Sequence, residues 1–140
     1  MLELVRESIA ALQNETASYP QGVQIWMKLM GGSFLASIVF IYWKEGARWI
    51  LTGLLLNLLG LVTGKMAFPD VSRTVLGTYV HILFWPAILW AVWRSRIELS
   101  LSRKGNSPFD WLYITWLMWA SLLMCISLVF DFRTLISLWT

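Results

Sequence analysis

Residues 49–68 read WILTGLLLNLLGLVTGKMAF, an apolar run of 20 residues with one charged side chain, Lys65. A helix of this length spans about 30 Å at 1.5 Å per residue, which matches the hydrocarbon core of a bilayer. Similar runs occupy 23–43, 74–93 and 109–130. Inside lipid every backbone polar group must be satisfied within the protein, so a chain this short can cross only as helices. The sequence therefore predicts four transmembrane helices.

The overall composition agrees with a membrane protein. Hydrophobic residues make up 58% of the chain and charged residues only 14%, whereas a soluble domain carries about a quarter charged residues. The net charge of +3 is scattered between the apolar runs, which argues against a nucleic-acid partner. We expect an all-α, polytopic integral membrane protein, a four-transmembrane-helix bundle whose surroundings are the lipid bilayer.

Short amphipathic segments flank the predicted bundle. In residues 1–22, Leu2, Val5 and Ile9 recur at helical spacing beside charged residues, and Pro20 ends the pattern. A similar pattern recurs in 132–140. We predict an interfacial helix in the headgroup plane at each end of a transmembrane domain over 23–131. Fraying extensions of the bundle are the open alternative.

Orientation in the membrane follows from the distribution of basic residues. The loops over 44–48 and 94–108 carry six Lys and Arg residues, and the side that holds both termini carries four. Because the side richer in Lys and Arg faces the cytoplasm, we predict that both termini lie outside the cytoplasm, in a plasma or inner membrane.

The second predicted helix has a face of small residues. Gly53, Asn57, Gly60 and Gly64 are spaced by four, three and four positions and share one face. Glycines let helices approach closely in lipid, which favours helix pairing within the chain or with a neighbour. The amide of Asn57 would then bond across the seam or, alternatively, bind a ligand.

The third predicted helix holds the one histidine of the chain. Gly77, His81 and Trp85 share a face, with Thr78 at its edge. An ionisable side chain within a span is a candidate functional residue, although a neutral imidazole bonded to a hydroxyl is equally compatible. His81 and Asn57 lie roughly 10 to 14 Å from the same boundary, so the two side chains could meet. We expect Asp131, at the end of the last span, to be solvated or to pair with Lys65 or Arg73.

The polar inventory excludes most catalytic chemistry. No acid is placed near His81, which argues against an enzyme and against a metal site. Our first hypothesis is a non-catalytic protein acting through helix contacts, as a homo-oligomer or an accessory subunit of a membrane complex. The second is an oligomeric channel or facilitator lined by Asn57, His81, Thr78 and Thr52. The third is a binder of a hydrophobic cofactor, pigment or quinone through His81, near Trp85.

Overall fold

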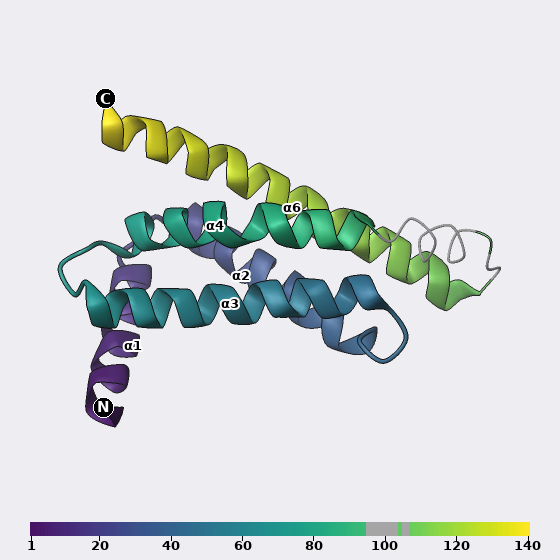
Figure 1. Cartoon of the computed structure of the whole chain (residues 1–140), viewed down its shortest axis with the longest axis horizontal. Coiled ribbons are helices and arrows are strands. Elements are labelled where there is room, and N and C mark those ends of the chain that lie inside the picture. Colours follow the sequence, from purple (N-terminus) through teal and green to yellow (C-terminus); the bar gives the residue numbers. More distant parts are fainter. Residues whose placement is uncertain (95–103, 105–106) are drawn as a thin grey trace.

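The computed structural model describes residues 1–94, 104 and 107–140, which form helices throughout their length apart from turns (Figure 1). An N-terminal helix, α1 (Leu2–Ala17), precedes α2 (Gln21–Leu35) and a short 3₁₀ helix, η1 (Ala36–Val39). The remaining helices are α3 (Glu45–Ala67), α4 (Arg73–Arg94) and α6 (Pro108–Trp139). Within the described residues, four helical segments are long and apolar enough to cross a membrane: α2 with η1, α3, α4 and α6. The prediction of four long apolar helices is confirmed.

The long helices lie alongside one another, and α1 lies across them (Figure 1). The helices α3 and α4 are antiparallel neighbours joined by a short loop over 68–72. This loop, α1 and the C-terminus all lie at the left end of the bundle in Figure 1. Both chain ends therefore lie at one end of the bundle.

The glycine-rich face of α3 is covered by α4. A Cβ at Gly53 would lie 3.3 Å from two carbons of Ile88, and a Cβ at Gly64 would lie 3.1 Å from Cδ2 of Leu76. At Gly60 the distance to Val80 would be only 2.9 Å. Because glycine has no side chain, α3 and α4 can pack closely here. The glycine seam of α3 is therefore filled by a helix of the same chain.

A cluster of aromatic rings fills the opposite end of the bundle. Phe40, which follows η1, stacks on Trp116 and lies against Phe109 and Tyr113, with ring centroids 5.2 to 5.4 Å apart. The helix α6 begins here because Ser107 caps its first turn, accepting a hydrogen bond from the amide of Phe109, and Pro108 occupies the first helical position. These ring contacts hold the end of the first long apolar helix against the start of α6.

Two helix ends differ from the sequence prediction. The first span was predicted to continue to residue 43, but its helix ends at Val39 and is followed by a turn. Residues 38–41 are β-branched or aromatic and are poor helix formers, and Arg48 binds the carbonyls of Ile41 and Tyr42. At the C-terminus, 132–140 is no separate helix, because α6 continues to Trp139 and residues 109–140 contain no glycine or proline.

Candidate functional site

An imidazole and a carboxylate meet between α4 and α6. His81 Nδ1 lies 2.8 Å from Asp131 Oδ2, and the hydroxyl of Thr78 donates to the other carboxylate oxygen at 3.3 Å. A carboxylate accepts hydrogen bonds, so with an ionised Asp131 this bond requires a hydrogen on Nδ1 of His81. The side chains of His81 and Asp131 are 17% and 14% exposed. Both oxygens of Asp131 are thus held by α4 in a site shielded from most solvent.

The sequence prediction for Asp131 was wrong. We expected a boundary charge that would be solvated or would pair with Lys65 or Arg73, and we expected no acid beside His81. Because α6 continues as a helix past 130, Asp131 extends the buried face of α6 instead. Residues of that face recur three or four positions apart: Leu117, Ala120, Met124 and Ser127. Continuing this spacing by four reaches Asp131, and that is the signal in the sequence that pointed to its position.

Trp85 covers one face of the histidine ring. The two ring centroids are 3.8 Å apart with planes inclined by 25°, and Phe34 meets the indole edge-on at 5.8 Å. Trp85 is 1% exposed, and its Nε1 has no hydrogen-bond partner among the described residues. An indole face attracts a cation, and the ring of His81 lies between such a face and a carboxylate. The group of Thr78, His81, Trp85 and Asp131 is referred to below as the His–Asp site.

The other sequence candidates lie outside this site. No hydrogen bond joins Asn57 to His81 in the part of the chain that the structure describes, and Asn57 Oδ1 is buried without a partner there. Thr52 donates to the carbonyl of Arg48, one turn earlier on α3. Gly77 approaches α3, with a Cβ position 4.0 Å from Leu61. Of the five ligand or pore candidates, Thr78, His81 and Trp85 come together, while Asn57 and Thr52 do not join them.

A second ionic cluster fastens α1 to the bundle. Lys65 donates to Glu15 Oε1 at 2.5 Å and to the carbonyl of Val71 at 2.9 Å, and the backbone amide of Arg73 donates to Glu15 Oε2 at 2.6 Å. The hydrogen bond from Lys65, followed by that from Arg73, holds the pKa of Glu15 below its ordinary value. Lys65 therefore bonds to Glu15 and Val71 at the end of α3. Asp131 bonds instead to side chains of α4.

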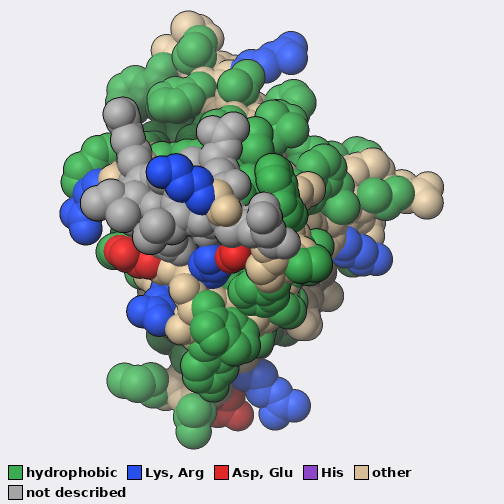
Figure 2. All heavy atoms as spheres, turned by 90° about the vertical axis from the view of Figure 1, so that its right-hand side faces the viewer, with side chains coloured by type: hydrophobic (Ala, Val, Ile, Leu, Met, Phe, Trp, Pro, Cys, Tyr) green, Lys and Arg blue, Asp and Glu red, His purple; other side chains and the backbone are tan. Residues whose placement is uncertain are grey.

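The opposite end of the bundle carries its own ion pair. Lys44 and Asp110 are 2.8 Å apart and link the start of α3 to the first turn of α6. Figure 2 looks onto this end and shows basic and acidic side chains among hydrophobic ones. Each end of the bundle thus has a polar cluster that joins separate helices.

No group of three or more His, Cys, Asp or Glu side chains suited to a metal ion occurs among the residues in 1–94, 104 and 107–140. Cys125 is an exposed free thiol on α6. Comparisons with family models, with curated proteins and with solved structures found no match for the chain.

Proposed function

We propose that the chain crosses the bilayer four times and acts there, without catalysing a reaction, through a proton-dependent contact between α4 and α6. The observation that carries this proposal is the 2.8 Å contact of His81 with Asp131. Ionisable side chains within a span are costly, and they occur mainly where a charge or a proton has a role. Both partners of this contact are side chains that can gain or lose a proton.

Proton gain or loss at this site would change how α6 is held. Imidazolium and carboxylate attract strongly where solvent is scarce, and neutralising one of them leaves a weaker hydrogen bond. Figure 1 shows α6 diverging from α4 toward its C-terminus, and Asp131 lies eight residues before the end of α6 at Trp139. Weakening the pair would free the last turns of α6, around Ile136, to move away from α4.

The distance between α4 and the end of α6 tests this proposal. Spin labels at two exposed positions, Tyr79 and Ile136, report that distance in nanodiscs between pH 5 and pH 8, after Cys125→Ser removes the native thiol. We expect a pH-dependent change in the distance distribution that disappears in Asp131→Asn. The matched control is Asp110→Asn, which alters an acid of α6 at the other end and should retain the pH response.

Two outcomes contradict the proposal. One is a distance that does not change with pH in the parent chain. The other is an equal pH response in Asp131→Asn, which would show that a group outside the His–Asp site titrates.

Proton movement across the membrane is a second candidate function. It is favoured by Nε1 of Trp85, a buried donor next to His81 that has no partner among the described residues and could therefore hold a water molecule there. Packed four-helix bundles fill their centre with side chains, so a water-filled path would need several copies of the chain. Liposomes with an imposed pH gradient test this: a leak that Asp131→Asn reduces supports a facilitator, and the absence of a leak excludes it.

Orientation and assembly complete the proposal. The termini would lie outside the cytoplasm, in a plasma or inner membrane, and the chain would work as a homo-oligomer or as a subunit of a larger complex. Fusion reporters placed at Asp70 and at Lys104 should give opposite signals, with the reporter at Lys104 cytoplasmic. Because the glycine seam of α3 is filled by α4, another copy or subunit would bind a different face of the bundle. Light scattering in detergent measures how many copies of the chain assemble.

A further inference from the structure

A shallow furrow of about 400 Å³ opens beside the start of α3, between this helix and the turn that follows η1. Its lining combines one basic side chain with mainly apolar ones: Ile41, Tyr42, Arg48, Leu51, Thr52 and Leu55. Arg48 lies one turn into α3, and the two leucines follow it, with Leu55 about 10 Å further along the helix. The furrow is therefore basic at the end of the bundle and apolar along its length.

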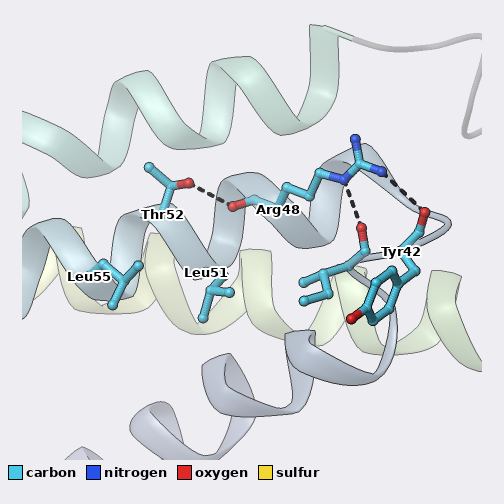
Figure 3. A pocket seen from close by; sticks show the side chains of 6 residues that line it. Tyr42, Arg48, Leu51, Thr52 and Leu55 are labelled. Carbon is cyan, nitrogen blue, oxygen red and sulfur yellow. Dashed lines mark hydrogen bonds between the residues drawn. The ribbon is translucent and has the colours of Figure 1, made fainter.

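Arg48 is held in place with part of its hydrogen-bonding capacity unused. Its Nε donates to the carbonyl of Ile41 at 2.7 Å, and its Nη2 donates to the carbonyl of Tyr42 at 3.1 Å. Figure 3 shows the third nitrogen pointing away from both carbonyls. No described residue accepts a hydrogen bond from that nitrogen, Nη1, whose two hydrogens suit an oxyanion such as a phosphate.

The position of Arg48 matches the headgroup level of a membrane. The aromatic residues Tyr42 and Trp43, in the preceding turn, are 79% and 68% exposed, and such rings favour the membrane interface. Glu45, the acid nearest in sequence, accepts a hydrogen bond from the indole of Trp49. We propose that this furrow binds an anionic phospholipid, whose phosphate contacts Arg48 and whose acyl chain lies along Leu51 and Leu55.

Binding of phosphatidylglycerol tests this site independently of the His–Asp site, which is built by α4 and α6. Native mass spectrometry of the detergent-purified protein compares the affinities for phosphatidylglycerol and phosphatidylcholine. One basic residue at a membrane surface contributes about a fivefold preference for an anionic lipid. We expect that preference in the parent chain and its loss in Arg48→Gln. The matched control, Arg133→Gln, changes an exposed arginine near the end of α6 and should keep the preference.

A second variant covers the possibility that Arg48→Gln disturbs the turn after η1. Leu55→Trp places a bulky ring in the apolar part of the furrow and leaves both arginine bonds intact, so it should also weaken phosphatidylglycerol binding. The proposal is overturned if the parent chain shows no preference, or if Leu55→Trp keeps the full affinity. Displacement of the lipid by soluble glycerol phosphate at equal affinity would also overturn it, because the site would then recognise a free phosphate.

Discussion

The close approach of α4 to Gly60 of α3 leaves little space for a side chain at this position. A methyl group added at Gly60 would lie 2.9 Å from Cγ2 and 3.1 Å from Cγ1 of Val80, whereas carbon atoms prefer separations of about 3.5 to 4.0 Å. Valine in a helix has one strongly preferred rotamer, so its methyl groups have little freedom to move aside. Overpacking of this kind costs roughly 1–3 kcal/mol, and we expect a steric cost of about 2 kcal/mol in Gly60→Ala, measured relative to a glycine position with free space.

Two other glycines serve as internal standards for this substitution. At Gly64 the nearest atom is Cδ2 of Leu76 at 3.1 Å, the far end of a flexible side chain, so Gly64→Ala should cost less than Gly60→Ala. Gly31 on α2 has nothing within 4 Å of its Cβ position, so Gly31→Ala meets no steric resistance. The gain in helix propensity from glycine to alanine, about 1 kcal/mol at most, is common to all three variants. The differences between them therefore report packing.

Reversible unfolding in mixed micelles, with sodium dodecyl sulfate added to a mild detergent, gives the free energy of unfolding for each variant. Adding Val80→Ala to Gly60→Ala removes both crowded methyl groups and should recover about 1 kcal/mol relative to the two single changes added together. If Gly60→Ala is as stable as Gly31→Ala, or if Val80→Ala brings no recovery, the packing of α4 on this face of α3 is refuted.

The two terminal ion clusters give further predictions. The pKa of Glu15 is lowered in the folded chain from an ordinary value of 4.5, so its stabilisation is complete above that value and is lost as the pH falls through the lowered pKa. Spin labels on α1 and α3 should therefore show α1 detaching in acid, and a Glu15→Gln variant whose α1 detaches with the parent's pH dependence would contradict this. Asp110→Asn removes the ion pair with Lys44 and a negative charge from the first turn of α6. It should lower the free energy of unfolding by about 1 kcal/mol in the same micelle assay. Unchanged stability would show that the pair contributes nothing.

The position of Asp131 could not be predicted from the apolar composition of the last span. The end of the apolar run at residue 130 was taken as the end of the last span, so Asp131 was assigned to the boundary. Apolar composition indicates which residues favour lipid, but a helix can continue past the end of an apolar run, and residues 131–140 contain no glycine or proline that would interrupt α6. Once α6 is extended, helical spacing from Leu117 leads to Asp131, although spacing alone does not reveal which helix lies opposite.

The glycine face of α3 is the complementary case. The spacing of Gly53, Gly60 and Gly64 identified a packing face, because small residues at helical spacing have few other uses in lipid. It did not indicate whether the partner helix came from this chain or from another one. The structure places α4 there, with Val80 against Gly60. Asn57 and His81 were expected to lie at a similar depth, but no hydrogen bond joins them in the part of the chain that the structure describes. Depth along a helix does not determine the direction in which a side chain points.

By itself the sequence determined the class of the fold and its four long apolar helices, since helix formation and hydrophobicity depend on residues near in the chain. Only the tertiary structure decided which side chains meet. The bond between His81 and Asp131 joins residues 50 positions apart, and Lys65 reaches Glu15 across the same separation. Such contacts depend on how far each helix extends and how it is rotated and inclined against its neighbours, and the packing of whole helices sets those quantities.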